Sequence, residues 1–263
     1  MQLSKQSMPK KISRIILREY YTYAVGLSKK LVLPQTKFII LSQGRTGSSL
    51  LQSLLDSHPQ ILCEGELLMY PVSFPNLYIK SMAARQYQKE VAWGFKVKPY
   101  HLTATQKIDL NKFICDFYAE GWKIIRLERK DIFRQTISGI IGKYRNTWVI
   151  TSENSKLNKT KIKIDPDQVI EWMEGKLKQT KWENEALEGL HYLNISYEHD
   201  LEDSENHQTT CNRICNHLKL PEKTIQTKLK KTTSRDLREE IENYDEVIDR
   251  LKNTEYAQFL PNL

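Results

Sequence analysis

The sequence of 263 residues has little cysteine, glycine and proline and no long hydrophobic run. Ten glycines and nine prolines are too few for a low-complexity or fibrous protein. No window approaches the roughly 18 uncharged apolar residues that a membrane-spanning helix needs, which argues against an integral membrane protein. The N-terminus also lacks the apolar core and the small-residue cleavage site of a secretory signal, so we expect a cytoplasmic protein.

The four cysteines are too sparse for a disulfide scaffold, which favours a reducing compartment. His207, Cys211 and Cys215 recur every four residues and would share one face of a helix, a spacing that zinc could exploit. Zinc-binding cysteines usually occur as CxxC pairs, however, and this sequence contains none. We therefore expect two half-buried thiols on a packed helix and no bound metal.

Basic residues are concentrated at the N-terminus. Residues 1–37 contain eight lysines and arginines and one acidic residue, a net charge of +7, whereas the whole chain carries +8. The other 226 residues therefore carry a net charge of only +1. A globular protein that holds nucleic acid carries its positive charge over the folded surface, so we expect no nucleic-acid partner.

The segment 1–36 is predicted to form a basic amphipathic helix that packs on or beside the main domain. Between Lys10 and Leu33 apolar residues recur at helical spacing, and Pro34 follows them. They are Ile12, Ile15, Ile16, Tyr20, Tyr23, Ala24, Leu27 and Leu31. The favoured interpretation is a helix packed on the domain. The alternative is that residues 1–33 rest on an anionic membrane surface or a partner, because basic residues flank the apolar stripe.

Residues 37–263 alternate between short apolar runs and longer segments with helical spacing. The apolar runs, typical of buried strands, span residues 37–41, 60–63, 91–97, 123–127 and 192–196. The helical patterns span residues 48–57, 108–118, 132–141 and 167–187, and further helices are expected between 198 and 263. This alternation predicts a single α/β domain with a parallel sheet flanked by helices. Residues 145–165, rich in Asn and Lys, are predicted to form an exposed functional loop.

A glycine-containing loop joins the first predicted strand to the first predicted helix of this domain. It reads Gly44-Arg45-Thr46-Gly47-Ser48-Ser49 and lies where open α/β sheets bind phosphate groups. The backbone N–H groups of Gly47, Ser48 and Ser49 would be free donors at the positive end of the helix, and Arg45 adds a fixed charge. Nucleotide kinases place a lysine after the last glycine of such a loop. None stands here, which disfavours Mg–ATP as the ligand.

Two segments of the sequence carry a family resemblance. The first, FIILSQGRTGSSLLQSLLDSHPQILCEGELL, runs from Phe38 to Leu68, and the second, IRLERKDIFRQTIS, runs from Ile125 to Ser138. They resemble the 5′-phosphosulfate loop and the 3′-phosphate motif of the carbohydrate sulfotransferases of bacteria and the Golgi. The likeness is strongest to the bacterial branch that sulfates nodulation factors and glycolipids.

The resemblance implies a sulfotransferase with a fold similar to that of P-loop nucleotide hydrolases. Such an enzyme moves a sulfuryl group from 3′-phosphoadenosine-5′-phosphosulfate (PAPS) to a hydroxyl group of a carbohydrate or glycolipid, and it needs no metal. The first motif implies that Arg45, Thr46, Gly47, Ser48 and Ser49 bind the phosphosulfate group of the donor.

The second motif implies that Arg129 and Ser138 bind the 3′-phosphate of the donor. These residues lie one position farther apart than is common in the family, so Lys130 is an alternative to Arg129. We favour Arg129, because a guanidinium group can hold a phosphate through two hydrogen bonds. Arg134, one helical turn before Ser138, is a further candidate.

Glu66 is the predicted general base that takes the proton of the acceptor hydroxyl. It follows the second predicted strand and matches the position of the family's catalytic acidic residue, while Glu64 competes with it for this role. Arg45 is assigned a catalytic role as well, because a cation must hold the charge that grows on the leaving phosphate.

Other interpretations of the sequence remain open. The chain could be a P-loop-like nucleotide kinase or NTPase, or a non-catalytic anion-binding module tethered by residues 1–37. Trp93, Tyr100 and Trp148 could stack on adenine or a sugar ring, although each is more typical of a core position. Residues 230–234 offer cations and hydroxyl groups, but a solvated helix start is the favoured interpretation.

Overall fold

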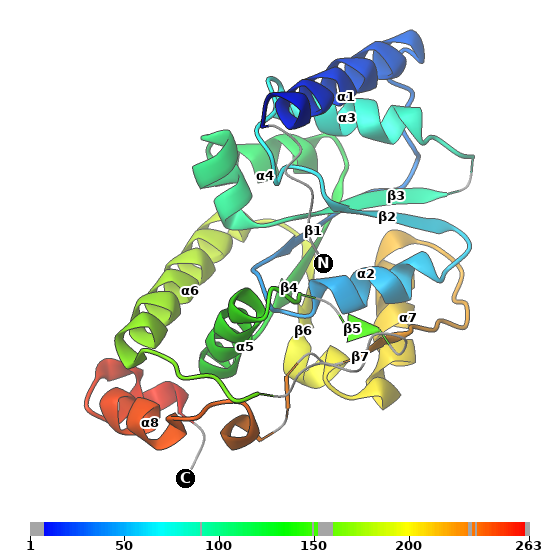
Figure 1. Cartoon of the computed structure of the whole chain (residues 1–263). Coiled ribbons are helices and arrows are strands. Elements are labelled where there is room, and N and C mark those ends of the chain that lie inside the picture. Colours follow the sequence, from blue (N-terminus) through cyan, green and yellow to red (C-terminus); the bar gives the residue numbers. More distant parts are fainter. Residues whose placement is uncertain are drawn as a thin grey trace.

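A five-stranded parallel sheet forms the centre of the computed structural model, which describes residues 8–89, 91–148, 150–151, 160–230, 233–234 and 236–260 (Figure 1). The strand order is β2-β3-β1-β4-β6. The strands are β1 (Lys37–Ser42), β2 (Ile61–Glu66), β3 (Ala92–Val97), β4 (Lys123–Glu128) and β6 (Tyr192–Ser196). The predicted α/β fold with a parallel sheet is confirmed.

The strand order places the loop after β1 in the middle of the sheet. β1 pairs with β3 on one side and with β4 on the other, so Ile39 lies beside both Phe95 and Ile124. β2 and β3, which follow β1 in sequence, lie on one side of it, and β4 and β6 lie on the other side. Ligands of open α/β sheets bind at the carboxyl ends of the strands where the order reverses in this way.

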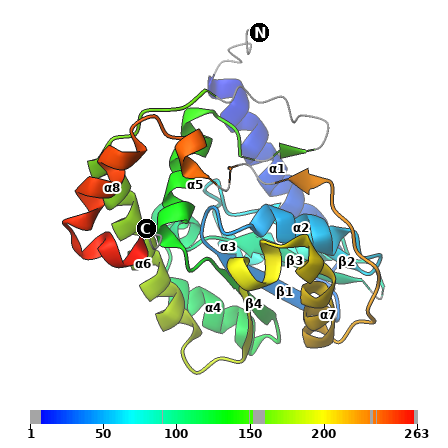
Figure 2. The same ribbon diagram turned by 90° about the horizontal axis from the view of Figure 1, so that it is seen from below.

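Helices cover both faces of the sheet, because the strands are apolar on both faces (Figures 1 and 2). Phe38 and Ile40 of β1 belong to the core that includes α2 (Ser48–Asp56) and α7 (His207–Leu218). Ile39 belongs to the opposite core. The helices of that core are α3 (Pro75–Arg85), α4 (Leu110–Ala119) and the carboxyl end of α6 (Pro166–Leu187).

A third apolar cluster joins α5 (Ile132–Tyr144) to the amino end of α6 and to the C-terminal part of the chain. The C-terminal part comprises short 3-10 helices at Leu237–Glu239 and Glu255–Phe259 and helix α8 (Tyr244–Lys252). α7 and α8 are helices that the sequence predicts after residue 198. α5 thus has a fixed position beside the sheet, which matters because Ser138 lies on it.

The segment 145–165 differs from the exposed loop that its polar composition predicts. Its residues 149 and 152–159 lie outside the described part of the chain. The strand β5 (Ile150–Thr151) pairs antiparallel with β7 (Leu229–Lys230). Ile162 and Ile164 are buried in the third cluster, and Ile162 forms a β-bridge with Ile241. The prediction was wrong at this end of the segment, because two isolated isoleucines leave no periodic signal.

The cysteines of α7 are core residues. Cys211 and Cys215 are fully buried, more so than the half-buried thiols that the sequence predicts. Burial raises the pKa of Cys211 to about 12, so its thiol stays protonated. The Nε2 atom of His207 lies 2.9 Å from the carbonyl oxygen of Leu201. The described residues contain no group of three side chains placed to hold a metal ion.

Helix α1 (Met8–Ser28) packs against α3 and ends before the predicted stop at Pro34 (Figure 1). Lys30 and Leu31 adopt left-handed backbone angles, with φ near 50°, and turn the chain away from the helix axis. The contact is close, because a Cβ atom on Gly26 would lie 2.5 Å from the Cβ atom of Ser81. None of the described helices is long and apolar enough to cross a membrane.

Candidate functional site

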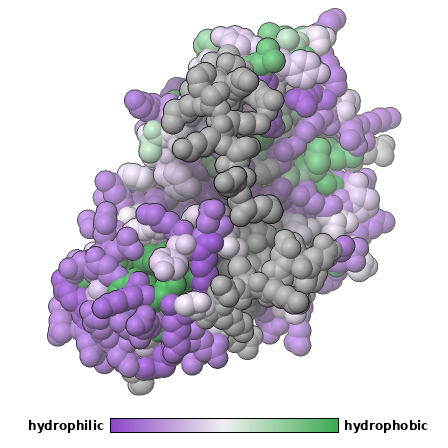
Figure 3. All heavy atoms as spheres, viewed as in Figure 1, coloured by the Kyte–Doolittle hydropathy of each residue, from purple (hydrophilic) through white to green (hydrophobic). Residues whose placement is uncertain are grey.

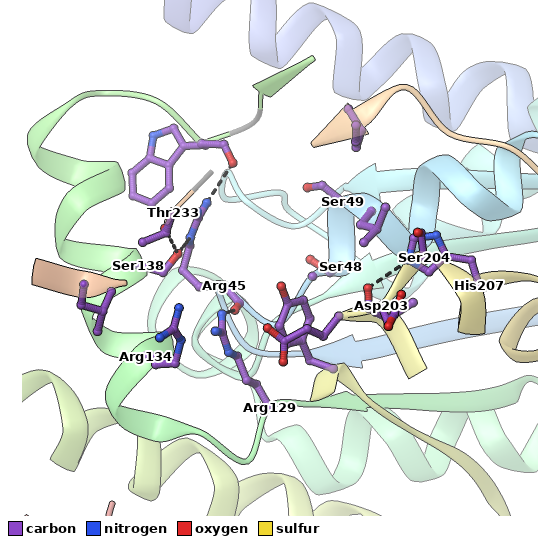
Figure 4. Close-up of a pocket in the computed structure, with 18 residues that line it drawn as sticks. Arg45, Ser48, Ser49, Arg129, Arg134, Ser138, Asp203, Ser204, His207 and Thr233 are labelled. Carbon is purple, nitrogen blue, oxygen red and sulfur yellow. Dashed lines mark hydrogen bonds between the residues drawn. The ribbon is translucent and has the colours of Figure 1, made fainter. Parts of the chain in front are cut away.

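A cavity of about 400 Å³ opens at the carboxyl ends of β1, β4 and β6 (Figure 4). The loops after these three strands contribute Arg45, Arg129 and Tyr197 to its walls. Six predicted donor-binding residues line it: Arg45, Gly47, Ser48, Ser49, Arg129 and Ser138. Two further predicted residues, Thr46 and Glu66, do not.

The loop after β1 has a backbone that only a glycine at position 47 accommodates. Gly47 has φ 87° and ψ 12° and precedes the first turn of α2. A Cβ atom on Gly47 would lie 2.7 Å from Cδ2 of Tyr197, so any larger residue would push the loop off this ring. The first N–H groups of a helix have no intrahelical acceptor. Ser48 and Ser49, in this first turn, therefore form a wall of the cavity whose geometry suits an anion.

Thr46 stabilises the loop after β1 through a buried hydrogen bond. Its side chain is buried and donates a hydrogen bond to the carbonyl oxygen of Gln43 at 2.9 Å. The Nε2 atom of Gln43 in turn donates to the hydroxyl oxygen of Thr180 on α6 at 2.8 Å. These contacts fix the shape of the loop, and Thr46 does not line the cavity that the predicted donor would occupy.

Arg45 joins the two sequence motifs physically. Its Nε atom donates to Oγ of Ser138 at 3.0 Å, and its Nη1 atom donates to the carbonyl oxygen of Trp148 at 2.8 Å. The guanidinium carbon lies 5.9 Å from the centre of the Trp148 ring. Gly139 of α5 makes room for the ring of Trp172, since a Cβ atom there would lie 2.8 Å from Cζ3 of that ring.

Arg129 lies next to Arg45 in the same wall of the cavity (Figure 4). Its Nη1 atom donates to the carbonyl oxygen of Arg45 at 3.2 Å, and its guanidinium group lies 4.3 Å from the centre of the Tyr197 ring. The Nε atom is buried without a hydrogen-bond partner and lies 3.8 Å from a carboxylate oxygen of Glu198. Burial, and then the charge of Arg129, lower the pKa of Arg45 to about 10. Both facts favour an anionic ligand at this wall of the cavity.

The other candidate residues for the 3′-phosphate differ in whether they line the cavity. Arg134 lines the cavity from α5 and donates to the carbonyl oxygen of Ser234 at 2.9 Å. Lys130 is exposed and does not line the cavity, although its backbone N–H donates to Glu198. Thr233 does line it, and its hydroxyl lies 3.2 Å from that of Ser138. Thr233 therefore contributes to the cavity, contrary to the favoured interpretation of the stretch 230–234, of which residues 231 and 232 lie outside the described part of the chain.

Asp203, Ser204 and His207 form the opposite end of the cavity (Figure 4). Ser48 and Ser49 lie between this end and the arginines. The cavity is thus strongly cationic at one end and mixed in polarity at the other.

Glu66 lies outside the cavity at the carboxyl end of β2. The pairing of β2 with β3 shifts register between Glu64 and Glu66, which marks a bulge. One carboxylate oxygen of Glu66 lies 2.8 Å from Nζ of Lys98, and the other lies 3.5 Å from Nε2 of His101. Burial lowers the pKa of His101 to about 4, so this imidazole is neutral at neutral pH. Two lysines lie near Glu66: Lys98, whose Nζ atom contacts it, and the buried Lys96, which lies opposite it in the register of β2 and β3.

Glu64 does not share the contacts of Glu66 with Lys98 and His101. It accepts a hydrogen bond from Nε2 of Gln86 at 2.5 Å, and Gln86 accepts another from Nε1 of Trp93. Trp93 is fully buried and belongs to the core, as its sequence favours. Glu64 is thus tied to the end of α3, whereas Glu66 faces the residues that follow β3.

Lys176 lies within electrostatic reach of Lys98 and of the arginines of the cavity, and sequence reasoning missed it. It lies on α6, and its Nζ atom donates to the carbonyl oxygen of Gly44 at 3.0 Å. Burial is the main cause that lowers its pKa to about 8. The positive charges of Lys98, Arg45 and Arg129 lower it further, while Glu183 opposes them. No local pattern marks this lysine, because α6 carries three lysines and only the fold shows which one faces the loop.

No protein-family model matches this sequence, and no curated protein matches it. Solved sulfotransferase structures do match. A sulfotransferase from Alicyclobacillus acidocaldarius aligns with 88% of this chain and 98% of its own, with a TM-score of 0.50 and 15% sequence identity. Mouse sulfotransferase SULT7A1, solved in complex with PAP, aligns with 89% of this chain and 91% of its own, with a TM-score of 0.42 and 12% identity. The first of these likenesses shows that the chain has the fold of a sulfotransferase.

Proposed function

We propose that the chain is a sulfotransferase that moves a sulfuryl group from PAPS to a hydroxyl group of a carbohydrate or glycolipid. The observation that carries the proposal is the hydrogen bond between Arg45 and Ser138. It joins the two motifs that resemble the 5′-phosphosulfate loop and the 3′-phosphate motif, inside one cavity with Arg129. The cavity lies where the strand order reverses, which is where this class of fold binds nucleotides.

The residues of the cavity fit a donor with two anionic groups. Ser48 and Ser49, at the amino end of α2, offer N–H groups and hydroxyls to the phosphosulfate, and Arg45 adds its charge. Arg129 and Ser138 take the 3′-phosphate. The Nε atom of Arg129 is buried without a hydrogen-bond partner, which supports this role, because a phosphate oxygen could accept its hydrogen bond.

Glu66 takes the proton when the acceptor oxygen forms its bond to sulfur. The bond between sulfur and the phosphate oxygen breaks, and its electron pair stays on that oxygen, so 3′,5′-ADP leaves. Arg45 and the N–H groups of the loop hold the charge that grows there. Glu66 and the loop lie at the same carboxyl edge of the sheet, on β2 and after β1, with β3 between them. The acceptor would bind in that interval, beside Lys98.

Lys176 is expected to supply a further positive charge to the transferred group. Lys176→Met should lower kcat/KM on the order of 10–100-fold, the worth of one charged hydrogen bond, whereas Lys176→Arg should retain more activity. The charge of Lys176 is present below its pKa of about 8 and is lost as the pH rises through that value. We therefore expect kcat/KM to fall above about pH 8 and to fall at a higher pH in Lys176→Arg.

The matched control for this lysine is Lys181→Met, on the exposed surface of the same helix, where the side chain only pairs with Glu185. It should leave the pH profile unchanged. A Lys176→Met enzyme with the kcat/KM and pH profile of the parent would show that Lys176 only braces the loop.

The proposed donor is tested by thermal unfolding with 3′,5′-ADP, Mg–ATP or inorganic sulfate. A ligand at ~100 times its Kd stabilises the native state by about 2.7 kcal/mol, which raises Tm by roughly 5–10 °C for a chain of this size. We expect this rise with 3′,5′-ADP and a much smaller one with the other two. A rise with Mg–ATP alone would overturn the proposal in favour of a kinase or NTPase.

A further inference from the structure

Over residues 17–28 of α1 the exposed face is more apolar than the buried face, which reverses the usual arrangement of an amphipathic surface helix. Leu17, Tyr20, Tyr21 and Leu27 are between 55% and 72% exposed, and they recur at helical spacing along one stripe. The residues that face the protein are Glu19, Thr22, Tyr23 and Gly26. Tyr20 and Leu27 therefore do not pack on the domain as the favoured sequence interpretation requires.

The buried face of α1 has a definite structural role, so the helix cannot simply be rotated. The hydroxyl of Tyr23 donates to a carboxylate oxygen of Glu19 at 2.8 Å, and the same oxygen accepts the backbone N–H of Ser73 at 2.6 Å. The N–H of Phe74 donates to the Tyr23 hydroxyl at 3.1 Å. These bonds, together with the close approach of Gly26 to α3, fix the apolar stripe outward.

The same hydrogen bonds attach α1 to the loop that follows Glu66, the proposed catalytic base, in sequence. Residues 67–74 run from Glu66 to the start of α3, and Met69, Tyr70 and Phe74 of this loop are 45–63% exposed. The ring of Tyr23 bridges the two surfaces, because it lies 6.4 Å from Tyr20 and 6.2 Å from Phe74, centre to centre. Hydrophobic atoms are visible at the top of the molecule, over α1 and α3 (Figure 3).

Positive charge surrounds this apolar surface. Arg18, Lys29 and Lys30 are exposed, whereas Glu19, the one acidic residue of segment 1–37, is buried. The segment carries a net charge of +7. A second copy of the chain would bring an equal positive charge to the same surface, which opposes pairing through it. An anionic bilayer complements both the charge and the aromatic stripe.

We propose that α1 and the loop 67–74 form a docking surface for an anionic lipid bilayer. Tyrosine side chains suit the boundary between lipid headgroups and acyl chains, because each has an apolar ring and a polar tip. Docking would place the loop next to Glu66 at the headgroup level. One consequence rests on the proposed function: a lipid-borne sugar would then reach the acceptor site from the bilayer surface.

The test is flotation of the full chain with vesicles of phosphatidylcholine, with or without phosphatidylglycerol. We expect binding to the vesicles that contain phosphatidylglycerol, little binding to the neutral ones, and a decrease with added salt. The triple substitution Leu17→Ser, Tyr20→Ser and Leu27→Ser should weaken binding at least about tenfold. The matched control is Tyr144→Ser, which removes a tyrosine that is 70% exposed on α5.

Two results would overturn the docking proposal. One is a parent protein that does not float with the anionic vesicles, and the other is a triple variant that binds them as the parent does. If sedimentation shows a dimer that the triple substitution dissociates, and no vesicle binding, the surface is an interface between copies. Stabilisation by 3′,5′-ADP, measured on every variant, confirms folding and separates the two proposals. Its absence in the parent would overturn the sulfotransferase proposal and leave the docking result standing.

Discussion

Glu66→Gln is expected to lower kcat by about 10²–10⁴-fold, the usual contribution of a positioned general base, and to leave the affinity for 3′,5′-ADP unchanged. The amide has the shape of the carboxylate but cannot accept the hydroxyl proton. Donor binding should persist because Glu66 does not line the cavity that holds Arg45 and Arg129. The measurement pairs steady-state kinetics on a sugar acceptor with titration of 3′,5′-ADP.

Glu64→Gln is the matched control for this experiment. Glu64 is two residues away and is tied to Gln86 at the end of α3, so its replacement should change Tm more than kcat. Normal turnover by Glu66→Gln would show that another group takes the proton. The same normal turnover combined with a large loss in Glu64→Gln would transfer the role of base to Glu64.

The order of strands and helices could be predicted because the signals are local. β1 is an unbroken apolar run, and the loop that follows it contains the glycines and serines of an anion site within six residues. Asp165 and Pro166 likewise mark the start of α6, since Asp165 accepts the N–H of Asp167 and Pro166 fills the first helical position. Nothing beyond neighbouring residues is needed to recognise these features.

The electrostatic surroundings of the site could not be predicted, because they depend on residues that only the fold brings together. Lys98 and Lys176 look like ordinary surface lysines in sequence, yet one lies beside Glu66 and the other beside Gly44. The hydroxyl of Thr233 contacts that of Ser138, although the two residues are 95 positions apart in sequence. The sequence also does not show which face of α1 is buried. Hydrogen bonds to loop 67–74 determine that face, and they leave no trace in the apolar periodicity.

Arg129→Ala is expected to weaken 3′,5′-ADP binding by about 2–5 kcal/mol, or roughly 30-fold to several-thousand-fold in Kd, since it removes a buried charge from its ionic partner. The loss should be specific to the 3′-phosphate. The parent should bind 3′,5′-ADP much more tightly than AMP, which lacks that group, and Arg129→Ala should bind the two with similar affinity. Calorimetric titration of both nucleotides measures this difference directly.

Lys130→Ala separates the two cations that the sequence leaves as alternatives. Lys130 is exposed and its side chain does not line the cavity, so the substitution should change Kd by less than about fivefold. Arg129→Lys adds a second check: it keeps the charge but loses the planar fork, and it should recover only part of the affinity. If instead Lys130→Ala abolished the preference for 3′,5′-ADP over AMP and Arg129→Ala retained it, the 3′-phosphate would bind outside this cavity wall. Arg129 would then serve only to brace Tyr197 and the backbone of Arg45.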